Sequence, residues 1–381
     1  MATTHSPGRF NVSPRDFLAP GLAASLLALG LLAIPVVLTR VLPGHRPSPP
    51  QWTAFIVVLA SLSVILGAVA LHRYRSLSTR RTLYGVVVGL AVLVPATWGL
   101  VQFSPLSVPP IQDSPGLRPY YHLIDFAVGS SLVVGSLIVG RFEYPDTPEY
   151  AALGVLFGLW IAYPALLPGA AGAFSLIGYL LVLAVPVFVG YILLADAGDL
   201  LSWVFESRVA RWFGATVTST IALFFIFSTG LIGTIPDNGT GLQWQHARVA
   251  FDRFQGPLVS WPAIEFWFPH VPIFGGFNIG YVITIGTLSV LVGLTAAVVA
   301  RQWQTGLTGG SDAVSGAAAL AGPNACCCCG PVFGQVAVAV LGPSLAAPIY
   351  WVFVDINSPL GVIFLTGSVF LLVRGLVKAA N

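Results

Sequence analysis

The sequence predicts an all-α fold, a polytopic membrane bundle of about ten transmembrane helices. Hydrophobic residues make up 56% of the 381 residues, whereas charged residues make up only 8%. In an ordinary soluble chain about a quarter of the residues are charged, so this chain has too few polar side chains to surround a core in water. Its mean hydropathy of +0.86 arises from repeated apolar runs of about 20 residues, the length that crosses a bilayer.

The expected spans are separated by short polar or Pro/Gly-rich breaks. Two of the ten expected spans follow Asp312. The first run comes after Arg9 and Arg15, as a signal peptide would, but it is long and lacks a small-residue cleavage site, so we expect a retained helix. The other eight, in chain order, are Leu18–Val41, Trp52–His72, Thr82–Phe103, His122–Gly140, Glu149–Leu167, Phe174–Ala195, Trp212–Ile235 and Phe277–Ala300.

Arginine positions predict the orientation. The loop His72–Arg81 contains four arginines, and the positive-inside rule places such a loop in the cytoplasm. Alternation then puts twelve of the 17 Lys and Arg residues on that side, with both termini cytoplasmic in a plasma membrane. The predicted parts are a cytoplasmic segment 1–17, an eight-helix bundle 18–300 with an external loop 236–276, and a cysteine-rich hairpin 301–381.

The long loop Pro236–Gly276 carries two further signals. Asn238-Gly239-Thr240 is an acceptor sequence for N-glycosylation, which agrees with an external position. The segment Trp261–Pro269 is rich in aromatic residues, which settle at the membrane interface. We expect an interfacial lid packed on the bundle, and a substrate-gating loop is the alternative.

Several function classes lack their motifs. There is no phosphate-binding glycine motif, no Ser/His/Asp arrangement and no HExxH, so an ATP-driven pump working from this chain alone is not expected. No basic run is dense enough to bind nucleic acid. The lipid bilayer is the expected partner, whereas protein partners and any enzymatic activity are not determined by the sequence.

The chemistry is concentrated in one cysteine cluster. All four cysteines, Cys326, Cys327, Cys328 and Cys329, are adjacent within the apolar stretch Ala313–Val354. Thiolates select soft cations of the Cu(I) and Hg(II) class. Pro323 and Gly330-Pro331 flank the cluster and interrupt helical hydrogen bonding, so adjacent sulfurs can turn toward one ion. We therefore predict four candidate ligands for a soft metal that is bound or transported.

Other interpretations of the cysteine cluster stay open. Adjacent thiols could cycle between thiol and disulfide in a membrane oxidoreductase. They could also pack as small apolar residues or be acylated. The chain would then be a non-catalytic scaffold or a subunit of a larger complex.

The C-terminal region 313–378 resembles the hairpin of mercuric-ion permeases. Cys328-Cys329-Gly330-Pro331, the apolar run Val336–Leu341 and the later run Leu360–Val373 correspond to that pattern. The resemblance implies transport of a soft metal ion. This chain departs from the family in having four cysteines, about eight preceding spans and no second cysteine pair in a cytoplasmic loop.

Ionisable residues near span ends are further candidates. His122 and Asp125 lie three positions apart on one expected helical face, where the carboxylate could orient the imidazole. The alternative is an interfacial pair that meets Arg118. Asp355 is a candidate at the outer start of the last span.

The stretch Ala313–Val354 could hold one crossing or two. We expect one crossing, with a break at Gly330-Pro331 and a short outer or re-entrant piece at Pro343–Trp351. A further full crossing would place the last basic residues outside.

Overall fold

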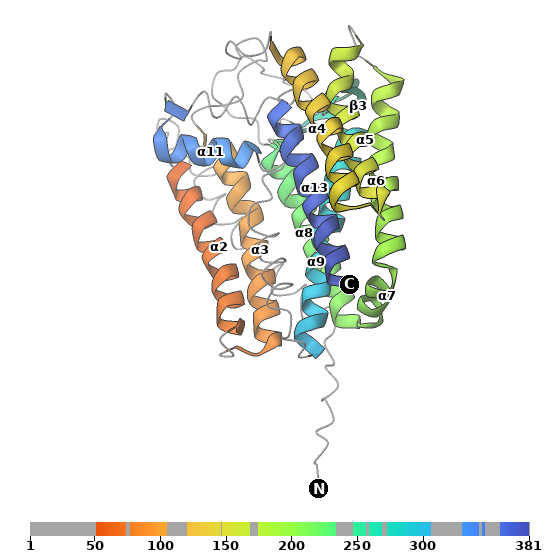
Figure 1. Cartoon of the computed structure of the whole chain (residues 1–381). Helices are drawn as coiled ribbons and strands as arrows, with labels where there is room; N and C mark the ends of the chain where they lie inside the picture. Colours follow the sequence, from red (N-terminus) through yellow and green to blue (C-terminus); the bar gives the residue numbers. More distant parts are fainter. Residues whose placement is uncertain are drawn as a thin grey trace, which may run out of the picture.

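The computed structural model describes most of the chain and shows a helical bundle with a small sheet at one end (Figure 1). The described residues are 51–73, 77–104, 120–145, 147–167, 174–233, 247–256, 259–268, 273–305, 330–342, 345–346 and 359–380. The first expected span, Leu18–Val41, lies outside these ranges.

Among the described helices, eight are long and apolar enough to cross a membrane. Seven coincide with the expected spans from Trp52–His72 to Phe277–Ala300, and the eighth contains Leu360–Val373. The architecture is that of a multi-pass membrane protein. The eight are α2 (Gln51–Arg73), α3 (Thr79–Gln102), α4 (Tyr121–Glu143), α5 (Pro148–Leu166), α6 (Leu176–Asp196), α8 (Arg208–Ser228), α9 (Ile279–Thr305) and α13 (Pro359–Ala380).

Local sequence explains where several helices begin. The Ser175 hydroxyl accepts from the Gly178 N–H at the start of α6, and the Ser207 hydroxyl accepts from the Ala210 N–H at the start of α8, both at 3.2 Å. Such caps satisfy N–H groups that have no partner within the helix. Pro148 occupies the first turn of α5, where a missing N–H costs nothing.

Large apolar side chains on the helices point outward. Leu176, Val187 and Leu194 of α6 are each 73% exposed, and Leu66 of α2 is 67% exposed. In water such surfaces would associate, whereas in a bilayer they contact lipid tails. The apolar outer surface and the length of the helices therefore both indicate a bundle that lies in a membrane.

The helices alternate between two ends of the bundle. At one end, Thr79 donates to the Trp303 carbonyl at 3.4 Å, and the Tyr150 hydroxyl donates to Asp196 at 3.0 Å. These bonds bring together the ends or starts of α3, α5, α6 and α9. We call this the arginine end, and the opposite end, which carries the strands, the sheet end. Basic residues at the arginine end are Arg73, Arg80, Arg81, Arg141, Arg208, Arg211, Arg301, Arg374 and Lys378.

The bundle core runs across non-consecutive helices. The largest buried cluster joins α5, α6, α8, α9 and α13, with Trp160 and Leu288 each 1% exposed. Smaller clusters join α3 to α8 and α9, and α2 to α3. The C-terminal helix α13 therefore shares the core of the main bundle.

The pair α4 and α5 packs most closely, because small residues line its contact. A Cβ added at Gly129 would lie 2.6 Å from the Ala162 nitrogen and the Gly158 oxygen. A Cβ at Gly158 would lie 2.6 Å from the Val133 side chain. Glycines allow backbones of membrane helices to approach in this way.

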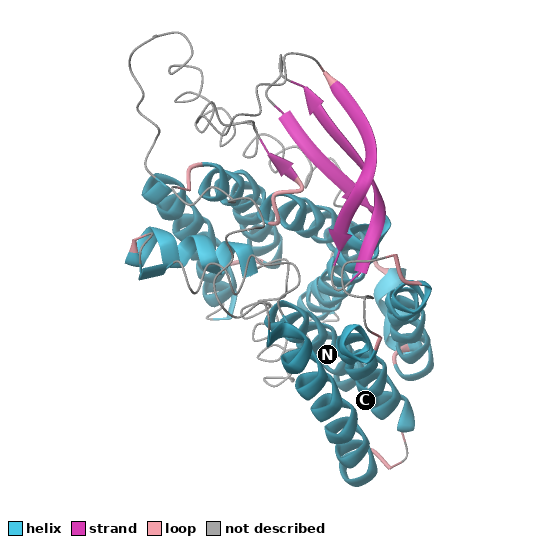
Figure 2. Cartoon of the chain, turned by 90° about the horizontal axis from the view of Figure 1, so that it is seen from above, coloured by secondary structure: helices cyan, strands magenta, loops and turns pink. Residues whose placement is uncertain are grey.

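A four-stranded antiparallel sheet is the main feature that the all-α prediction missed. Its order is β1-β4-β3-β2, from β1 (Ile232–Gly233), β2 (Arg248–Gly256), β3 (Val259–Phe268) and β4 (Ile273–Asn278). Figure 2 shows these strands together at one side of the bundle when it is seen from above. The expected loop 236–276 is thus largely strands, stabilised by cross-strand pairs such as Val249 with Phe266.

The short helix α11 (Gly330–Leu341) lies in the C-terminal region where a hairpin was expected. It has 12 residues and is about 18 Å long, which is too short for a bilayer core of about 30 Å. In Figure 1 it lies across α2 and α3 rather than along them. The expected break at Gly330-Pro331 coincides with its start, and Val336–Leu341 lies within it, whereas residues 306–329 lie outside the described ranges.

Candidate functional site

Several predicted site residues lie outside the part of the chain that the structure describes. These are the cluster Cys326–Cys329, Asp355 and the acceptor Asn238. Within the described residues, no group of three or more His, Cys, Asp or Glu side chains could hold a metal ion. Two candidates, His122 and Asp125, are described.

The expected partnership of His122 with Asp125 does not form. The His122 side chain is exposed, whereas Asp125 is 4% exposed and lies where α4 meets α5. The Asp125 Oδ1 atom is buried and has no hydrogen-bond partner. His122 and Asp125 are three residues apart, so their side chains differ in direction by about 300°, or about 60° in the opposite sense. In α4 this difference is enough to expose His122 while Asp125 packs on the neighbouring helix.

Asp125 lies among small residues and tyrosines near the sheet end. It precedes Gly129, which touches Ala162 of α5, by one helical turn. Tyr163, next to Ala162, lies in the last turn of α5 at this end of the bundle. Tyr179 lies in the first turn of α6 at the same end. In the sequence, these residues could have been found as two tyrosines within apolar runs, each near the same end of its span as Asp125.

Tyr179 connects the helices to the sheet. Its hydroxyl donates to the Ser260 carbonyl of β3 at 2.7 Å, and its ring lies against Trp261 with centroids 4.3 Å apart. Trp261 is 4% exposed, and its indole occupies the space above Gly280, where any Cβ would collide with it. The aromatic segment expected at the interface is therefore anchored on the bundle as a strand.

Asn278 joins the sheet to α9. Its side-chain oxygen accepts from the Tyr281 N–H at 2.8 Å, which caps the helix that follows β4. Its Nδ2 atom and the Trp261 Nε1 atom are buried without a partner. Buried donors of this kind are uncommon in folded proteins, and they lie at the same end of the bundle as Asp125.

A second polar contact holds α11 against α2 and α3. Gln51 Nε2 donates to Gln335 Oε1 at 2.7 Å and to the Leu100 carbonyl at 3.1 Å. Gln335 is the one amide side chain in α11, and it is 3% exposed. A glutamine within an apolar run indicates a buried polar contact. Its partner, however, is 284 residues away and could not be identified from the sequence.

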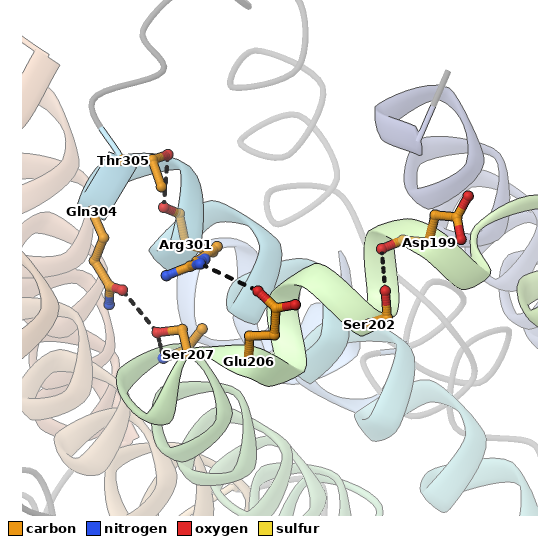
Figure 3. Close-up of polar contacts among 8 residues, drawn as sticks. Asp199, Ser202, Glu206, Ser207, Arg301, Gln304 and Thr305 are labelled. Carbon is orange, nitrogen blue, oxygen red and sulfur yellow. Dashed lines mark hydrogen bonds and ion pairs between the residues drawn. The ribbon is translucent and has the colours of Figure 1, made fainter.

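The arginine end carries a cluster of polar contacts that Figure 3 shows in close-up. Arg301 lies 3.9 Å from Glu206 and 5.2 Å from the centre of the Trp203 ring. Ser207 donates to Gln304 at 2.8 Å. These contacts fasten α9 to α7 (Gly198–Glu206) and to the start of α8. Glu206 is 71% exposed, so the pair is a surface contact that contributes little stability.

A small hollow lies in the bundle between α5, α6, α9 and α13. Phe157 and Trp160 line it together with two threonines, Thr284 and Thr287. Both threonine hydroxyls donate to backbone carbonyls of their own helix, at 2.9 and 2.7 Å. The wall therefore offers an incoming ligand mainly apolar contact.

Comparison of the chain with known protein families, curated proteins and solved structures finds no match.

Proposed function

We propose that this chain is a plasma-membrane protein that binds a soft, thiophilic metal ion through Cys326–Cys329 and moves it across the bilayer. In this proposal both termini are cytoplasmic, the arginine end faces the cytoplasm and the sheet end faces outward. The metal ion is the cargo. Four adjacent thiols in an apolar stretch are a donor set suited to Cu(I) or Hg(II).

The distribution of basic residues supports the orientation. Among the described residues, nine Lys and Arg lie at the arginine end, and two, Arg248 and Arg253, lie in β2 at the sheet end. Positive residues near span ends favour the cytoplasmic side. The anchored sheet is a folded structure of the kind that an external segment can form in water.

The single observation that carries the transport proposal is the position of α11. Thr305 ends α9 at the arginine end, whereas Gln335 of α11 is bonded to Gln51 at the sheet end. Cys329 is the residue immediately before α11. The segment between α9 and α11 connects the arginine end to the sheet end. The proposal therefore places the thiols in this connecting segment, next to the sheet end.

The test compares metal binding by purified full-length variants. The wild type should bind Hg(II) or Cu(I), and the double variant Cys328→Ser/Cys329→Ser should lose most of that affinity, because serine is nearly isosteric but a poor ligand for soft cations. Cys327→Ser, which leaves three of the four thiols, is the comparison variant and should lose less affinity than the double variant. Unchanged thermal unfolding of all three would show that packing is intact.

Other outcomes would overturn the proposal. If wild-type protein shows no cysteine-dependent affinity for either ion, the thiols serve packing. If the free-thiol count instead changes with the redox potential and no metal binds, the adjacent cysteines form a redox pair.

A further inference from the structure

Asp125 is the one charged residue among the buried side chains of the described chain. It lies in the first turns of α4, four residues after the helix begins at Tyr121. An ionised carboxylate inside a membrane bundle is costly, and such residues mark ion or proton pathways by default. The buried carboxylate therefore needs either a compensating group or a bound cation.

The described neighbours of Asp125 provide no cationic partner. Among the described elements, the helices that pack most against α4 are α5 and α13. The titratable residue that α5 carries at this end of the bundle is Tyr163. The charged residues of α13, Arg374 and Lys378, lie at the arginine end, with Arg374 over the Tyr144 ring. On α4 itself, His122 is exposed on another face.

We propose that Asp125 is the binding site of a small monovalent cation, a proton or Na⁺, held between α4 and α5 near the sheet end. One carboxylate supplies one negative charge, which matches a monovalent ion. Its Oδ1 atom is buried and has no hydrogen-bond partner. Carboxylate and hydroxyl oxygens are hard ligands, which suit these ions and not the soft ions expected at the cysteines.

The packing of α4 on α5 does not by itself require an acid at this position, and Arg118, the partner considered from the sequence, lies outside the described residues. Asp125 continues the α4 face on which Gly129 and Gly140 meet α5, where a small apolar side chain would pack without any cost of desolvation. At the same end of the bundle, Tyr179 donates to the Ser260 carbonyl of the sheet. Asp125 lies near the sheet end, so in this proposal the cation enters from there. The proposal is independent of the cysteine cluster.

The experiment labels full-length protein in membranes with a hydrophobic carbodiimide and locates the product by mass spectrometry. The O–H of a neutral carboxyl adds across one C=N bond of the reagent to give an O-acylisourea, which rearranges to a stable N-acylurea without loss of any group. Asp125 should be labelled at least about tenfold faster than the exposed Asp199, because an apolar reagent reaches neutral carboxyls inside a bundle. Asp125→Asn should abolish that product and keep the unfolding temperature of the wild type.

Two arms distinguish the cations. If the site binds Na⁺, sodium but not choline chloride should slow the labelling of Asp125 at constant pH. If it binds only protons, labelling should fall as the pH rises and should be indifferent to sodium. If Asp125 reacts no faster than Asp199 throughout, or if neither pH nor sodium changes its reaction, the proposal is overturned.

Discussion

The side-chain amides of Gln51 and Gln335 are joined by a hydrogen bond of 2.7 Å across 284 residues of sequence. Gln51 begins α2, and Gln335 lies in the middle of α11. Both are buried, and Gln51 also donates to the Leu100 carbonyl of α3. This bond therefore fixes α11, the helix that follows the cysteine cluster, to the sheet end of the first two described helices.

The first prediction concerns this amide pair. Gln335→Leu alone should lower the free energy of unfolding by about 0.5–1.5 kcal/mol, because it removes the Oε1 acceptor and leaves the buried Gln51 amide with backbone carbonyls as its partners. The double variant Gln51→Leu/Gln335→Leu should lose less stability than the sum of the two single variants, since each single variant already removes the bond between the two amides. Thermal unfolding in detergent measures both. Strictly additive losses would contradict a direct coupling.

The second prediction concerns the contact of α4 with α5. Gly129→Ala should destabilise the protein by about 1–3 kcal/mol, because the new Cβ would meet the backbone of Gly158 and Ala162 at 2.6 Å. Gly135→Ala on the same helix is the matched control. No atom lies within 4 Å of its added Cβ, so it should be neutral or slightly stabilising. Equal effects of the two substitutions on unfolding temperature would show that α4 and α5 do not pack in this way.

The third prediction concerns the anchoring of the sheet. Trp261→Ala should cost about 3–5 kcal/mol, because it removes a buried indole from Tyr179 and Gly280. The β2–β3 hairpin should then become susceptible to limited proteolysis. Phe251→Ala, at a position 84% exposed in the same hairpin, is the control and should leave the digestion pattern unchanged. A Trp261→Ala protein as resistant as the wild type would exclude the anchoring role.

The fourth prediction concerns orientation. Single cysteines are introduced at Ser78 and at Phe251, both exposed, in a background without the native thiols. An impermeant maleimide applied to intact cells should label Phe251→Cys and leave Ser78→Cys unlabelled until the membrane is opened. Reversed labelling would invert the proposed topology, because Ser78 lies at the arginine end and Phe251 lies in the sheet.

The spans followed from the amino-acid sequence because transfer into lipid depends on the hydrophobicity of about 20 consecutive residues. A run such as Phe277–Ala300 carries that information without reference to the rest of the chain. The structure confirms a helix there, α9, which continues to Thr305. The boundaries were less well determined, since the span expected at Trp212–Ile235 is the helix α8, Arg208–Ser228.

Three features depended on contacts between distant residues. The strands β2 to β4 are stabilised by pairing with one another and by Trp261 on Tyr179, and their sequences lack a simple alternation. Helix α11 turns across the bundle because its buried amide meets Gln51. Asp125 and His122 share an expected helical face by spacing, yet close packing on α5 buries only the aspartate. Local hydrophobicity determines which segments enter the membrane, whereas the burial of single polar groups is decided by which neighbour packs against them, and that neighbour can be far away in the sequence.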